Sequence, residues 1–119
     1  MDVYVPGRAM RNPHLQTTRS RLLPLRVHLP EPELVLVDMP DGSGDRLAVL
    51  LHEGDPDKPL VLVVHGLGGS AESDYVRYVT AGLLDAGFPV GRIDLRGAGT
   101  GEYAVGMYHG GKTEDVRAV

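Results

Sequence analysis

The sequence contains no cysteine. Within this chain, that absence excludes disulfides, thiolate zinc sites, iron–sulfur clusters and a cysteine nucleophile. It fits a reducing cytosol, and no apolar stretch near the N-terminus has the form of a signal peptide, so we expect a cytoplasmic location. No apolar run is longer than that at residues 60–64, which is far below the roughly 20 residues that a membrane helix needs, so we expect no membrane span.

Basic residues are few as well. Lys and Arg total 12 against 16 Asp and Glu, which gives a formal net charge of −4. Binding of nucleic acid requires a basic face to neutralise phosphates, so the acidic balance argues against such a partner. The chain is 42% hydrophobic and 24% charged, a composition typical of globular proteins. Its 16 glycines and 9 prolines among 119 residues predict short elements and many turns, which argues against a helical bundle.

The first part of the chain divides into an arm and a hairpin. Residues 1–32 show no hydrophobic period and are repeatedly interrupted by proline, so we predict an extended N-terminal arm there and one main domain over residues 33–119. Residues 33–39 and 46–52 have β-rich composition and flank a turn signal at residues 41–45. This pattern predicts an antiparallel hairpin.

The second part predicts a βαβ unit. Residues 60–64 and 88–95 are largely apolar runs of the kind found in strands buried on both faces. Between them, residues 73–86 have helical periodicity. A parallel pair with a right-handed crossover follows. With the hairpin, it gives an α/β fold with a mixed, mostly parallel sheet, and another helix is expected to begin at Thr113.

Local signals define the first predicted helix. Ser73 is its expected N-cap, and Gly87 is its expected C-terminal stop. Val76, Val79 and Leu83 are expected to form its buried stripe.

The glycine loop after the first buried strand has two chemical interpretations. In the first, the His65–Gly69 turn presents the Leu67 N–H as an oxyanion donor for acyl transfer, and His65 braces the loop. The alternative to that interpretation is a tight turn with an incidental histidine. In the second, residues 66–94 form a dinucleotide-binding unit, with the glycines at the pyrophosphate and Asp94 on the ribose. Acidic residues before the helix are unfavourable beside a phosphate.

A third motif lies near the C-terminus. Residues 106–113 spell G-x-x-x-x-G-K-T, the pattern of a phosphate-binding P-loop. A P-loop needs a buried strand before it, and residues 99–105 have only a short, mixed apolar run. A surface loop capped by Thr113 is the competing interpretation.

Several motifs together resemble one family. They are Asn12–Thr17 (Asn-Pro-His-Leu-Gln-Thr), His65–Ser70 (His-Gly-Leu-Gly-Gly-Ser), Arg96-Gly97 and Tyr108–Asp115 (Tyr-His-Gly-Gly-Lys-Thr-Glu-Asp). In order and spacing they resemble the YheT-like branch of the α/β-hydrolases, the AB hydrolase 4 group, over residues 12 to about 117. Gly110 departs from this pattern, because the branch usually has serine there.

The resemblance implies an esterase- or lipase-type serine hydrolase that acts on a small-molecule or lipid-like ester without a cofactor or metal. Its catalytic residues come in the chain order Ser, Asp, His. Carried over by position, the Leu67 N–H is one oxyanion donor, and His65 and Gly66 shape its loop. The same resemblance makes Asp94, Arg96 and Gly97 structural supports of the loop at the end of the second buried strand.

The nucleophile itself is missing. No serine has glycine two positions before and two positions after it, which excludes a G-x-S-x-G elbow at Ser20, Ser43, Ser70 and Ser73. The family order then places the whole triad beyond residue 119, so none of the histidines is assigned as the base: His14, His28, His52, His65 and His109. We expect the chain to be about the first third of a hydrolase and, without the triad, inactive on esters. We also expect it to fold poorly alone, because its parallel strands would be uncovered.

Overall fold

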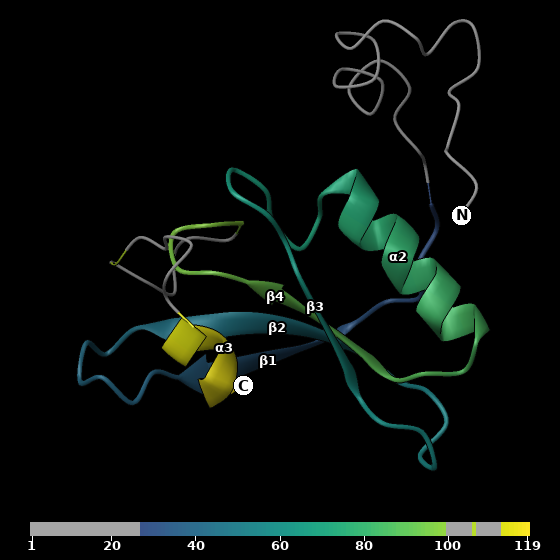
Figure 1. The fold of residues 1–119 in the computed structure, drawn as a ribbon, viewed down its shortest axis with the longest axis horizontal. Coiled ribbons are helices and arrows are strands. Elements are labelled where there is room, and N and C mark those ends of the chain that lie inside the picture. Colours follow the sequence, from purple (N-terminus) through teal and green to yellow (C-terminus); the bar gives the residue numbers. More distant parts are fainter. Residues whose placement is uncertain (1–26, 100–105, 107–112) are drawn as a thin grey trace, which may run out of the picture.

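The computed structural model describes residues 27–99, 106 and 113–119. Its elements follow the order strand, strand, strand, helix, strand, helix (Figure 1). They are β1 (Glu33–Asp38), β2 (Arg46–His52), β3 (Val61–Val64), α2 (Asp74–Asp85), β4 (Val90–Asp94) and α3 (Thr113–Ala118).

The four strands form one sheet in the order β1-β2-β4-β3. β1 pairs antiparallel with β2, β2 pairs antiparallel with β4, and β3 pairs parallel with β4. The predicted hairpin and βαβ unit are therefore both present. Within the described residues one of the three pairings is parallel and two are antiparallel, so the sheet is mixed, as a hairpin followed by a βαβ unit predicts.

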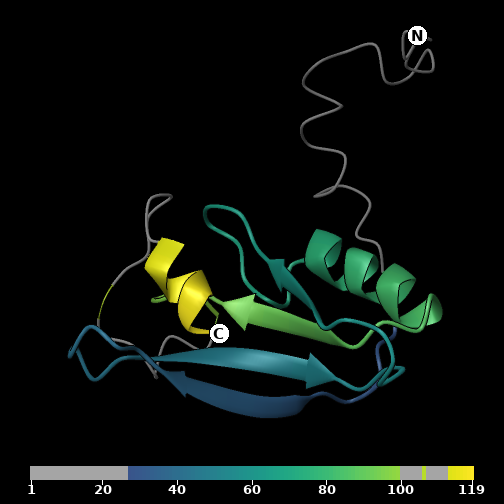
Figure 2. The ribbon, with the colours of Figure 1, turned by 60° about the horizontal axis from the view of Figure 1, so that its bottom comes forward.

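The central strands β2 and β4 bury side chains on both faces of the sheet, because alternate residues of a strand point to opposite sides. β3 lies at the edge of the described sheet and contains no buried residue, so the expectation that residues 60–64 form a strand buried on both faces was wrong for the described structure. One face carries the main apolar cluster, formed by Met39, Leu47, Val49 and Ile93, and the end of α3 packs against it through Ala118 and Val119. The opposite face carries Arg92 and Asp94 of β4, which bond to the segment leading into α2. The two helices lie toward opposite ends of the sheet (Figures 1 and 2).

The buried stripe of α2 differs from the prediction, because Val79 is exposed and Leu83 is only half-buried. Val76 and Thr80 are fully buried, whereas Val79 is 48% exposed. Thr80 can occupy the buried position because its hydroxyl donates to the Val76 carbonyl at 2.7 Å, which satisfies the polar group within the helix. The expectation that Val79 belongs to the buried stripe was wrong, because the apolar pattern gives no signal for a threonine satisfied in this way.

The ends of α2 follow local chemistry. Gly87 has a positive φ of 86°, and its N–H donates to the Leu84 carbonyl while Phe88 N–H donates to the Leu83 carbonyl. This pair of backbone hydrogen bonds is a Schellman motif, which confirms the prediction that the helix ends at Gly87. Ser73 does occupy the N-cap position, but its Oγ accepts the Ser70 N–H at 2.9 Å and does not cap the helix.

Part of the predicted arm can be located. Residues 27–32 contain no helix or strand, Leu29 is buried, and the Val27 carbonyl accepts a bond from Arg77 of α2. Residues 1–26, including the Asn12–Thr17 motif, lie outside the described residues. The division at residue 32 stays a prediction.

Candidate functional site

A tight turn follows β3 at its carboxyl end. Gly69 N–H donates to the Gly66 carbonyl at 3.0 Å, and Gly68 has a φ of +73° at the third position of this turn. Only a residue without a Cβ adopts that conformation readily, which is why glycine stands there. Leu67, at the second position, is 89% exposed, and its N–H has no hydrogen-bond partner among the residues that the structure describes.

His65 connects this turn to the neighbouring strand end. Its side chain is buried, its Nδ1 lies 2.8 Å from the Gly66 carbonyl oxygen, and its Nε2 lies 3.2 Å from the Leu95 amide nitrogen. Because an amide N–H can only donate, Nε2 is the acceptor and the ring proton is assigned to Nδ1, which donates to Gly66. Both ring nitrogens are engaged, so His65 is bound in the loop as a neutral group.

Asp94, the last residue of β4, lies under the same loop. Its carboxylate is buried and accepts the Ala71 N–H at 2.7 Å. A Cβ on Gly99 would lie 2.2 Å from Asp94 Oδ2, so the chain after β4 closes tightly over this carboxylate. An acid that binds a ribose must be open to the ligand. The geometry therefore disfavours the dinucleotide interpretation, and the turn at residues 66–69 is also separated from α2 by residues 70–73.

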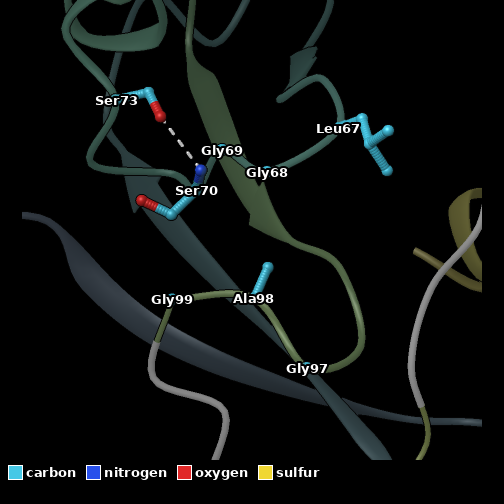
Figure 3. A pocket seen from close by; sticks show the side chains of 8 residues that line it. All are labelled: Leu67, Gly68, Gly69, Ser70, Ser73, Gly97, Ala98 and Gly99. Atoms are coloured by element: carbon cyan, nitrogen blue, oxygen red, sulfur yellow. Dashed lines mark hydrogen bonds between the residues drawn. The ribbon is translucent and has the colours of Figure 1, made fainter.

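The loop after β3 (residues 65–73, the β3 loop) and the loop after β4 (residues 95–99, the β4 loop) line an open cleft of about 610 Å³. Figure 3 shows the β3 loop on one side and the β4 loop on the other, with the bond between Ser73 and Ser70 at its edge. Among the described residues, the lining comes from these two loops and consists of Leu67, Gly68, Gly69, Ser70, Ser73, Gly97, Ala98 and Gly99. Apart from Leu67, they have small side chains or none.

Arg96, near the start of the β4 loop, connects this loop to α3 and to the β1–β2 turn. Its guanidinium makes two bonds to Asp115 of α3, at 2.9 and 2.8 Å, and reaches Asp45 at 3.2 Å and Asp41 at 2.7 Å in the β1–β2 turn. Burial lowers the pKa of Arg96, but hydrogen bonds to Asp115 and Asp41 outweigh it and raise the pKa above its usual value. Gly97, which follows, has a φ of +73° and lines the cleft.

Asp41 is exposed, and hydrogen bonds from Ser43, together with Arg96, hold its pKa far below the usual range. Arg96 therefore joins three separate segments, which are the hairpin turn, the β4 loop and α3.

A second buried charge cluster lies on the α2 side of the sheet, and the sequence analysis did not predict it. Arg92 of β4 is 1% exposed and donates to His52 Nε2 at 3.1 Å, to the Ala71 carbonyl at 2.7 Å and to Glu72 at 2.9 Å. Glu72 also pairs with Arg77. The only available signal was an arginine in the middle of an apolar strand, which requires buried partners.

His52 gives this cluster a pH dependence. Burial, reinforced by the charges of Arg92 and Arg77 and opposed by Glu72, lowers the pKa of His52 below its usual 6.5. The unfolded chain therefore binds this proton more readily than the folded chain. The stability that neutral His52 contributes is complete above about pH 6.5 and is lost as the pH falls through the lowered folded-state pKa.

We expect His52→Gln to flatten this dependence, because a glutamine oxygen can accept the Arg92 N–H without titrating. The free energy of unfolding of the full-length protein would be measured by denaturant titration at about pH 5 and about pH 7.5. It should fall less on acidification in this variant than in the unaltered protein. His28→Gln, at an exposed position, is the matched control and should keep the original slope. Equal slopes for the unaltered protein and His52→Gln would contradict the assignment.

No family model matches the chain. A search of curated proteins and a search of solved structures both find similar proteins. Over 115 residues the chain is 32% identical to a protein of Escherichia coli (strain K12) named "Putative esterase YheT". The match covers 95% of this chain and 34% of that protein, so the chain spans about a third of the length of this relative.

Two solved structures share the arrangement of strands and helices. An α/β serine hydrolase without a lid, from Xanthomonas campestris, matches with a TM-score of 0.57 and 26% identity, over 78% of this chain and 44% of that one. A serine hydrolase homologue from Coxiella burnetii matches with a TM-score of 0.54 and 21% identity, over 77% of this chain and 45% of that one. The described part of the chain has the fold of an N-terminal portion of an α/β-hydrolase, and the chain is similar in sequence to a protein of that class over most of its own length.

The described elements are an N-terminal portion of the α/β-hydrolase fold, as the sequence predicts. The match to YheT agrees with the resemblance to the YheT-like branch. Of the P-loop pattern at residues 106–113, residues 107–112 lie outside the described part, as does most of the Tyr108–Asp115 motif. Thr113 does begin a helix.

Among the described residues, neither helix has the length and the apolar character that crossing a bilayer requires. No three acidic or histidine side chains among them gather in a way that could bind a metal ion.

Proposed function

We propose that this chain is the N-terminal part of a cytoplasmic serine hydrolase that cleaves carboxylic esters through an acyl-enzyme, without a cofactor. One observation carries the proposal: the Leu67 N–H lies in a fixed glycine turn beside an open cleft, with no partner among the described residues. A preorganised backbone donor of this kind is what a tetrahedral oxyanion requires. The relatives, named as an esterase and as serine hydrolases, support the same chemistry.

The remaining catalytic groups are expected downstream of residue 119. The polar side chains that the structure describes near the cleft are already engaged: Ser73 Oγ accepts from Ser70 N–H, Ser70 Oγ accepts from Glu72 N–H at 3.2 Å, and His65 is bonded at both nitrogens. None of them is paired as a serine nucleophile with a histidine base. Asp94 accepts the Ala71 N–H and lies close under Gly99, which suits a structural support better than a triad acid.

The proposed reaction combines the Leu67 N–H with the serine and histidine expected downstream. The downstream serine Oγ attacks the ester carbonyl carbon while the histidine takes its proton. The carbonyl oxygen becomes an oxyanion that accepts the Leu67 N–H and the N–H of the residue after the serine. Collapse of the intermediate breaks the bond to the alcohol, which leaves with the proton from the histidine. Water repeats the sequence on the acyl-enzyme and releases the carboxylic acid.

A comparison of the full-length protein with the 119-residue chain tests this function. Both would be treated with a fluorophosphonate probe, which labels activated serines, and assayed on p-nitrophenyl esters of increasing acyl length. We expect the full-length protein to be labelled and to hydrolyse esters with a burst of p-nitrophenol, and the chain alone to do neither. A full-length protein that folds, is not labelled and leaves every ester intact would refute the proposal, and burst hydrolysis by the chain alone would refute its division of the catalytic groups.

A further inference from the structure

Tyr75 contacts the glycine turn from the first turn of α2. Its Oη accepts the Gly66 N–H at 2.7 Å, across nine residues of sequence. A Cβ on Gly69 would lie 2.7 Å from the same Oη, so the hydroxyl fits closely against the inside of the turn. No motif in the sequence marks this tyrosine.

The hydrogen bonds around Gly66 determine where the Leu67 N–H points. The Gly66 carbonyl and the Leu67 N–H belong to one planar trans peptide, so the N–H points opposite to the carbonyl oxygen. That oxygen accepts from His65 Nδ1 and from Gly69 N–H. The preceding peptide is held on its N–H side by Tyr75.

Gly66 is where such restraint matters most. A glycine without restraints rotates freely about φ and ψ, and rotation there would turn the Leu67 peptide and its N–H. His65 restrains the residue from its carbonyl side and Tyr75 from its amide side. We propose that Tyr75 is a positioning residue for the oxyanion hole, whose hydroxyl keeps the Gly66–Leu67 peptide in the orientation that presents the Leu67 N–H to the substrate. This inference rests on the proposed function.

Tyr75→Phe in the full-length protein tests it, because the change removes only the hydroxyl. Tyr78→Phe is the matched control, since Tyr78 lies on the same helix and is similarly exposed, at 57% against 50%. We expect Tyr75→Phe to lower kcat for p-nitrophenyl ester hydrolysis three- to tenfold, which corresponds to the net value of about one hydrogen bond, with KM changed less than twofold. Tyr78→Phe should change neither constant.

Amide hydrogen exchange gives a readout that does not depend on activity. We expect the Gly66 N–H to exchange at least about tenfold faster in Tyr75→Phe than in Tyr78→Phe, because its acceptor is gone. An active protein whose kcat is unchanged by Tyr75→Phe overturns the positioning role, whether or not Gly66 exchange rises. An unaltered protein that hydrolyses no ester overturns the proposed function, and this role with it.

Discussion

Replacing Leu67 with proline is expected to lower kcat for ester hydrolysis by the full-length protein about 10²- to 10³-fold, the usual effect of removing one oxyanion-hole donor. Proline has no N–H, so the change deletes the proposed donor directly. The turn itself should persist, because Leu67 occupies the second position of the turn, where proline is favoured. Its side chain is 89% exposed and leaves no cavity when replaced.

Leu67→Ala is the matched control, because it shortens the same side chain and keeps the N–H. It should leave kcat within about threefold of the unaltered protein, while KM responds to any contact of the leucine with substrate. The thermal midpoint of Leu67→Pro should stay close to that of Leu67→Ala, which separates a catalytic from a folding effect. If Leu67→Pro retains full kcat, Leu67 does not supply the oxyanion donor.

Local signals predicted most of this architecture. The apolar runs and turn residues predicted the hairpin and the strands and helix of the βαβ unit, because each of these elements depends on residues a few positions apart. Gly87 ends α2 for an equally local reason, its positive φ. Val79 was misassigned because the sequence shows which residues are apolar and not which polar residues can be satisfied in place, as Thr80 is.

In the candidate site too, the residues placed by local sequence could be predicted, and the contacts between distant segments could not. His65 and Leu67 were identifiable because a glycine turn directly after a strand has few geometries. The contact of Tyr75 with Gly66 depends on how α2 packs on the sheet, and no spacing rule gives that. Arg92 likewise has partners from β2 and from the loop before α2, two segments that meet only in the folded chain.

The second large effect concerns stability. Arg96→Met is expected to lower the free energy of unfolding of the full-length protein by about 3–5 kcal/mol, the cost of breaking a buried ion pair by removing one partner. The side chains of Arg96, Asp45 and Asp115 are only 5%, 5% and 3% exposed. Methionine fills a similar volume but leaves two buried carboxylates without their cation. Chemical denaturation at neutral pH measures the loss.

Arg117→Met is the matched control, because Arg117 is an exposed arginine in the last turn of α3 and should cost less than about 1 kcal/mol. Adding Asp115→Asn to Arg96→Met tests the cause. If the penalty comes from an unpaired carboxylate, neutralising Asp115 recovers part of the loss, and the double variant is more stable than the sum of the single effects predicts. Strictly additive losses would mean that Arg96 acts mainly through packing of its alkyl chain, and the join between the hairpin turn, the β4 loop and α3 would then not be electrostatic.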